Sequence, residues 1–265
     1  MKEKIIYYQD ERNDEFSTAE ITPRTIDGSY DYIRDGFWGR CAHILCYRVI
    51  AEPLAWLYLK IRFRHKTVNR SLLKEAKKTG YYLYGNHTNA GADALIPSML
   101  TFPKAASVIV HPNNVSMPVL GRITPYLGAL PLPDDKPAMK NFSKALKTLM
   151  EKKMPVVIYP EAHIWPYYTD IRDFSDASFH YPVADDVPVY CFTNTYQKKR
   201  FGKSPKIVTY VDGPFYPAAG ADGQKPNAKE KRQSLRNQVY ATMKERAKNN
   251  TVELIHYVKK DIEHD

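Results

Sequence analysis

Two short stretches, Tyr84-Gly-Asn-His-Thr-Asn-Ala-Gly-Ala-Asp93 and Val157-Ile-Tyr-Pro-Glu-Ala-His163, each continue from an apolar run that is typical of a β-strand. Each stretch places acid or base side chains directly after the end of its strand. In an open parallel sheet, the loops at the carboxyl ends of the strands form the binding crevice. We therefore expect His87, Asp93 and Glu161 to lie in one pocket.

Strand and helix patterns alternate on both sides of these stretches. Strands are predicted over residues 81–84, 106–110, 155–159, 187–192 and 206–211, and helices over residues 91–100, 137–153 and 227–248. The helix over 137–153 is the clearest, because its apolar residues repeat at helical spacing. This alternation predicts an α/β fold with a mainly parallel central sheet covered by helices.

The N-terminal part is predicted to be mainly helical and lacks the alternation of strands and helices. Residues 30–64 carry two helical patterns separated near Pro53, because proline disrupts a helix interior. They are rich in apolar and aromatic side chains and lead into the basic run 60–66, which is typical of an amphipathic helical pair lying on a membrane. A core helix pair with a solvated basic end has the same composition. We predict residues 1–66 as an N-terminal segment with this pair, and residues 67–265 as the α/β domain.

Charge and composition limit the classes of binding partner that the protein is expected to have. The 265 residues carry a formal net charge of +10, which suits an anionic membrane surface, a nucleic acid or an acidic protein. No nucleic-acid recognition motif is present, so no nucleic-acid partner is expected. Neither a secretory signal nor a membrane span is predicted. We expect Cys41, Cys46 and Cys191 to be reduced, buried thiols in a cytosolic protein, because they form no metal-type pair.

His87 and Asp93 have the chemistry of a general-base pair. A histidine after a strand titrates near neutral pH, and an aspartate on the following helical turn can hold its other ring nitrogen. Taken alone, such a histidine is more often structural. Glu161, presented after a second strand, strengthens the catalytic interpretation.

Four segments, taken in order along the chain, place these residues in a known pattern. Asn86-His87 with Asp93 comes first, then the block 118–132 with Gly121 and Gly128, then Tyr159-Pro-Glu161, and finally the apolar run 186–193. In this order they resemble the glycerol-phosphate and lysophosphatidate acyltransferase superfamily, over about residues 80–195. That family carries N-H-x-x-x-x-D, a glycine-containing block and F/Y-P-E-G-T-R.

The resemblance implies an O-acyltransferase of phospholipid biosynthesis. It would move a fatty acyl chain from acyl-CoA or an acyl-acyl-carrier-protein to a hydroxyl of a lysophospholipid-type acceptor. It implies no tightly bound cofactor and no metal. The implied partners are an anionic membrane surface, the carrier of the thioester and the lipid acceptor, and the implied location is cytoplasmic, peripheral on the inner face of the cell membrane. The implied catalytic residues are His87 and Asp93, and the implied substrate-binding residues are Asn86, Gly121, Gly128, Glu161, Ala162, His163 and Arg172.

The chain departs from the family pattern at two places. Five residues separate His87 from Asp93 instead of four, and Gly91 is suited to absorb the extra one. The arginines that bind an acceptor phosphate are absent, since Ala162-His-Ile164 follows Glu161 and Asp134-Asp135 follows the glycine block. Candidate replacements are Arg122, Lys136, Lys140, His163 and Arg172. His163 is alternatively a second acid/base group or a surface residue.

Two other function classes stay open. A metal-dependent hydrolase would use His87, Asp93, His111, Glu161 and His163, which lie near strand ends but lack a familiar ligand spacing. A non-catalytic lipid-binding protein on the same scaffold is the other, because a fold does not fix a function.

Overall fold

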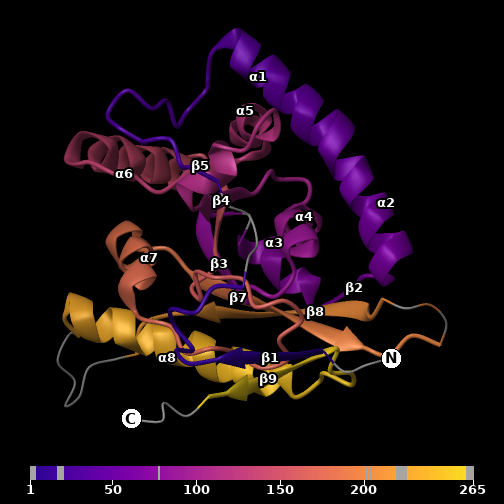
Figure 1. Cartoon of the computed structure of the whole chain (residues 1–265). Coiled ribbons are helices and arrows are strands. Elements are labelled where there is room, and N and C mark those ends of the chain that lie inside the picture. Colours follow the sequence, from indigo (N-terminus) through magenta and orange to yellow (C-terminus); the bar gives the residue numbers. More distant parts are fainter. Residues whose placement is uncertain are drawn as a thin grey trace.

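The computed structural model describes residues 4–16, 21–76, 78–200, 202, 204–218 and 226–260. Within these residues, a seven-stranded sheet organises the chain, with strand order β2-β8-β7-β3-β6-β4-β5 (Figure 1). The strands are β2 (Lys66–Val68), β3 (Tyr81–Gly85), β4 (Ser107–Val110), β5 (Ala129–Pro131), β6 (Pro155–Ile158), β7 (Val189–Gln197) and β8 (Lys206–Phe215). Strands β3 to β7 are mutually parallel, and only β8 and its neighbour β2 run the other way among the described strands. The predicted mainly parallel sheet is confirmed.

Helices cover both faces of this sheet. The central strand β3 shows why, because Tyr82 and Tyr84 enter one buried cluster while Tyr81 and Leu83 enter another. The first cluster is covered by α6 (Lys136–Glu151), α7 (His180–Asp185) and α8 (Ala228–Ala247). The second is covered by α2 (Glu52–Phe63), α3 (Leu73–Ala76) and α4 (Ala90–Thr101). The short helix α5 (Leu120–Ile123) lies between β4 and β5.

The N-terminal helical segment is continuous instead of broken. Helix α1 (Phe37–His43) passes into a π-helix (Ile44–Ala51) and then into α2. Pro53 lies in the first turn of α2, where a missing N–H is tolerated, and the Glu52 N–H donates to the carbonyl of Tyr47, five residues back. The expected separation of two helices near Pro53 is therefore wrong.

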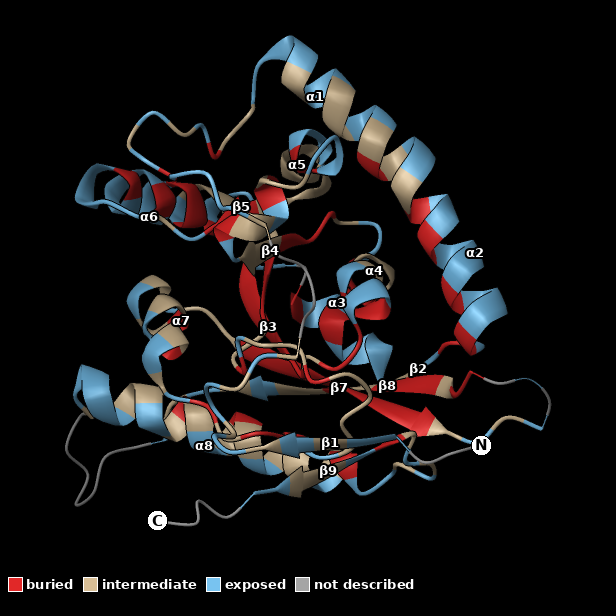
Figure 2. Ribbon diagram, in the orientation of Figure 1, coloured by how far each residue is buried: buried red, intermediate tan, exposed pale blue. Residues whose placement is uncertain are grey.

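One side of this long helix packs on the domain and the other is open. Ala55, Leu59 and Phe63 are buried on the packed side. The open side appears as the exposed stripe along α1 and α2 in Figure 2. Its exposed apolar side chains are Phe37, Trp38, Ile44, Leu45, Val49, Ile50, Leu54, Leu57 and Ile61. Within the described part of the chain, no helix combines the length and the apolar character needed to cross a bilayer.

The cysteines are free, but they are not all buried. Cys41 is exposed and Cys46 is half-buried, whereas Cys191 is buried in β7. The expectation of three buried thiols is thus wrong for the first two, because they lie on the long helix, which packs against the domain on one side only.

The two ends of the described chain meet in a small second sheet. Strand β1 (Lys4–Tyr8) pairs in parallel with β9 (Ile255–Lys259). The sequence predicts a short strand at residues 5–8 but not its partner. The division of the chain at residue 66 stays a prediction. The run 214–227 is rich in Pro, Gly and Ala, which predicts a surface loop, and it lies partly outside the described residues.

Candidate active site

His87 and Asp93 meet at the carboxyl end of the central strand. His87 follows β3, and Asp93 lies in the first turn of α4, which Asn89 caps by accepting from the Ala92 N–H. The His87 Nδ1–H donates to Asp93 Oδ2 across 3.0 Å. The His87 ring stacks on Tyr159 with centroids 4.4 Å apart. About a fifth of the His87 side chain (19%) is exposed, so the ring is not sealed off from a substrate.

The environment of Asp93 is that of an ionised carboxylate. Its Oδ2 also accepts from the backbone N–H groups of Thr88 and Asn89, each at 2.8 Å, and its Oδ1 accepts from Asn194 Nδ2 at 3.1 Å. A carboxylate that receives four donors and is almost fully buried is stabilised in its acceptor-only form. Nδ1 of His87 therefore carries the proton of this hydrogen bond, and Nε2 is the ring nitrogen that remains for another partner.

A buried hydrogen-bond chain extends from Asp93 across the sheet. Asn194 in β7 accepts at Oδ1 from the Thr209 hydroxyl of β8 at 2.6 Å. Thr209 Oγ1 in turn accepts from His65 Nε2 at 2.9 Å, so the donors point one way from His65 to Asp93. All three residues are buried. The sequence alone does not single them out as site residues; the signal in β7 is the polar run at residues 193–195 inside an otherwise apolar strand.

Glu161 holds the backbone of His87 in place. It follows β6, the neighbour of β3, and its Oε2 accepts from the His87 backbone N–H at 3.0 Å. Its Oε1 accepts from the Arg172 backbone N–H at 3.2 Å, and the Arg172 guanidinium lies 3.6 Å from Oε2. Burial raises the pKa of Glu161, and the charge of Arg172 opposes that rise. The pair thus fixes the backbone that presents the imidazole.

Arg172 is fully buried, and its guanidinium points into the protein. It donates to the backbone carbonyls of Glu161, His163 and Glu11, and it packs 4.9 Å from the Trp165 ring. The structure therefore gives Arg172 a supporting position, and its contact with a substrate stays a prediction.

The loop that carries Glu161 and Arg172 is held by both ends of the chain. The Trp165 ring stacks on Tyr257 of β9 with centroids 5.0 Å apart and contacts Tyr8 of β1 at 4.7 Å. The Trp165 indole N–H donates to the carbonyl of Asp14, and Tyr257 donates to the carbonyl of Pro166. The small β1–β9 sheet is thus part of the wall that supports the site.

Ala162 and His163 form the turn after Glu161. Ala162 has φ +63°, a left-handed conformation that favours glycine, which the family pattern has at this position. His163 is one-third exposed, and its Nδ1 lies 3.5 Å from Glu15. Both residues are near the His87 loop, and their contact with a substrate stays a prediction.

The other candidate residues have defined structural positions. Asn86 braces the end of β3 against β7 through two hydrogen bonds with the Asn194 backbone, at 2.8 and 3.1 Å. Gly121 and Gly128 lie between β4 and β5, where an added Cβ would approach backbone oxygens within 2.7 and 2.3 Å. These two glycines allow close backbone packing, and their contact with a substrate also stays a prediction.

The metal-ligand candidates do not converge. In the described part of the chain, no group of three or more His, Cys, Asp or Glu side chains is arranged to hold a metal ion. His111 is exposed at the end of β4, where it accepts from the Asn113 N–H.

No protein-family model matches this chain, and no curated protein matches it by sequence. Among solved structures, the chain is similar to the crystal structure of the 1-acyl-sn-glycerophosphate (LPA) acyltransferase PlsC from Thermotoga maritima, at 14% sequence identity and a TM-score of 0.46. The similarity covers 80% of this chain and 94% of that chain.

Proposed function

We propose that this chain is an O-acyltransferase that moves a fatty acyl group from a thioester donor to a hydroxyl of a lysophospholipid-type acceptor. The observation that carries the proposal is the buried Asp93 carboxylate, which holds His87 Nδ1–H at 3.0 Å and leaves Nε2 as a base. The sequence resemblance of the surrounding motifs supplies the reaction class.

The chemistry follows from this geometry. His87 Nε2 takes the proton of the acceptor hydroxyl while its oxygen attacks the thioester carbonyl carbon. Asp93 stabilises the imidazolium that forms. When the carbon–sulfur bond breaks, the leaving thiolate takes the proton back from Nε2, so the imidazole is regenerated. The backbone amides at the open start of α4, around Ala90 and Gly91, are the groups suited to stabilise the oxyanion.

We propose that the chain works on the cytoplasmic face of the cell membrane. The exposed apolar side of the α1–α2 segment supports this, since soluble monomers rarely leave so large an apolar stripe uncovered. Arg62, Arg64 and Lys66 at the end of the stripe add positive charge that suits anionic lipids. A peripheral position would bring an acceptor lipid to the protein without its leaving the bilayer.

The test is acyl transfer from labelled acyl-CoA and acyl-acyl-carrier-protein to lysophosphatidate, glycerol phosphate, neutral lysolipids and sugar lipids. The wild type is compared with His87→Ala and with the control His256→Ala, an exposed histidine of β9. Transfer to one acceptor that is lost in His87→Ala and retained in His256→Ala supports the proposal. A protein that binds vesicles but transfers nothing from either donor would instead be a lipid-binding scaffold.

A further inference from the structure

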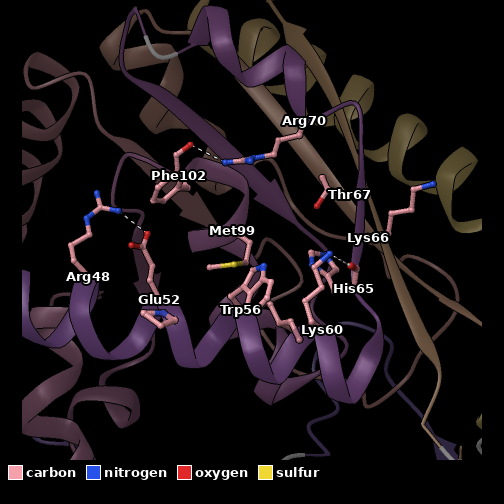
Figure 3. A pocket seen from close by; sticks show the side chains of 12 residues that line it. Arg48, Glu52, Trp56, Lys60, His65, Lys66, Thr67, Arg70, Met99 and Phe102 are labelled. Carbon is pink, nitrogen blue, oxygen red and sulfur yellow. Dashed lines mark hydrogen bonds and ion pairs between the residues drawn. The ribbon is translucent and has the colours of Figure 1, made fainter.

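A cavity lies beside α2, apart from the His87–Asp93 pair. It has a volume of about 610 Å³ and is bounded by α2, the start of β2 and the end of α4 (Figure 3). Neither His87 nor Asp93 lines it. Its size is in the range of cavities that hold small organic ligands.

The cavity wall carries an excess of positive charge. Four cationic side chains line it, against one carboxylate, Glu52. Glu52 is bound by Arg48 at 2.7 Å, so that pair is neutral. In the described part of the chain, Lys60, Lys66 and Arg70 have no carboxylate within ion-pair distance.

Backbone carbonyls hold two of these cations in place. Lys60 Nζ donates to the carbonyl of His65 at 3.0 Å. Arg70 donates to the carbonyls of Leu100 and Phe102 at 3.1 and 2.9 Å. A carbonyl orients a cation without neutralising it, so the positive charge remains for an anionic ligand. These two side chains come from different elements and both reach the cavity in Figure 3.

Apart from His65 and Thr67, the rest of the wall is apolar. Trp56 and Leu59 of α2 face Met99 and Phe102 at the end of α4. His65 also lines the cavity, and burial, aided by the nearby Lys60, lowers its pKa to about 4. It is therefore neutral at physiological pH and serves as a hydrogen-bonded wall residue. The cavity thus matches a ligand with an anionic group and an apolar part.

We propose that this cavity binds an anionic phospholipid, with its phosphate near Lys60, Lys66 and Arg70 and part of its chain against Trp56 and Met99. A lipid is favoured because α2 forms the wall and also exposes Leu54, Leu57 and Ile61 to the outside, so the cavity borders the apolar stripe. Coenzyme A also combines phosphates with a ring that Trp56 and Phe102 could stack on, and the experiment separates the two sources. This site goes beyond the proposed transfer and does not depend on it.

The experiment is isothermal titration calorimetry with dihexanoyl phosphatidylglycerol below its micelle concentration. Lys60→Gln/Lys66→Gln is compared with the control Lys144→Gln/Lys147→Gln, which removes the same charge from exposed positions on α6. We expect saturable binding to one site that is weakened about tenfold or more by the cavity variant, as for lost charge-assisted hydrogen bonds, and unchanged in the control. Trp56→Ala should also weaken binding, and His87→Ala should not.

Four results would overturn the proposal. One is the absence of saturable binding by the folded wild type. Another is equal weakening by the α6 control, which would mean attraction by net charge alone. The third is binding of coenzyme A that is lost in the cavity variant and displaces the phospholipid, which would assign the cavity to the thioester donor. Dihexanoyl phosphatidylcholine is the probe for headgroup charge, and binding as tight as that of phosphatidylglycerol would also contradict the assignment.

Discussion

Replacing Arg172 by methionine tests whether this arginine supports Glu161. Arg172 is fully buried, and the Glu161 carboxylate beside it is also buried. Methionine fills much of the same volume but leaves the carboxylate with two backbone N–H donors and no nearby cation. Breaking a buried ion pair by removing one partner costs about 3–5 kcal/mol, so we expect the free energy of unfolding to fall by about that amount at neutral pH.

The loss of stability in Arg172→Met depends on pH through the pKa of Glu161. Burial already raises the pKa of Glu161, and Arg172 is the main group that opposes the rise. Without Arg172 the folded-state pKa of Glu161 rises further above its unfolded value. The folded state then holds a proton that the unfolded state has released, so the variant loses stability as pH rises through that pKa and regains it in acid.

The assay is urea unfolding of wild type and Arg172→Met at about pH 8 and about pH 5. The double variant Arg172→Met/Glu161→Gln should be more stable than Arg172→Met at about pH 8, because it contains no unpaired buried charge. Lys244→Gln, which removes the partly exposed ion pair with Asp170, is the control and should cost less than about 1 kcal/mol. A loss below about 1 kcal/mol for Arg172→Met, or a loss that grows in acid, would refute the supporting role.

Three further substitutions test the site and the membrane surface. Asp93→Asn should lower turnover about 100-fold or more with an unchanged circular dichroism spectrum, because the amide no longer fixes the basic tautomer of the imidazole; near-normal turnover would exclude the pairing. Thr209→Val removes the hydroxyl that bonds Asn194 at 2.6 Å and should lower kcat about tenfold at constant KM, whereas a rise in KM alone would contradict a positioning role. Leu57→Asp/Ile61→Asp should weaken co-sedimentation with anionic vesicles about tenfold or more, while Met139→Asp on α6 should not, and equal loss in both would argue against the stripe as the contact surface.

The sequence predicts those parts of the site that depend on strand ends. Apolar runs before His87 and Glu161 mark two strands, and the rule for parallel sheets then brings the two residues to one edge. The structure places them together through the His87 N–H to Glu161 hydrogen bond at 3.0 Å. Their roles in catalysis stay predictions.

The series of hydrogen bonds from Asp93 through Asn194 and Thr209 to His65 cannot be predicted from local sequence patterns. Asn194 and Thr209 face each other because β7 and β8 pair in one particular antiparallel register. A single sequence does not reveal that register. The inward position of Arg172 is similar, since it depends on Trp165 and on strands from both ends of the chain.

Pro53 shows a second reason why a local sequence rule can fail. The rule that proline breaks a helix interior applies to an α-helix with regular hydrogen bonds. Here the π-helix before Glu52 shifts the hydrogen bonds by one residue, so proline enters a first turn that needs no donor from it. The low helix propensity of proline is a correct description of Pro53 alone, but the helical segment around Pro53 determines whether the helix continues.

The pairing of β1 with β9 also has a consequence for the order in which the protein matures on the ribosome. Chain elongation delivers the His87 strand and the Glu161 loop long before residues 255–259. Until that last strand emerges, Trp165 lacks the Tyr257 ring on which it stacks, and the small sheet that backs the loop does not exist. The strand ends of the main sheet that carry His87 and Glu161 can therefore form early, whereas the loop that contains Trp165 acquires its final packing only after β9 has been translated.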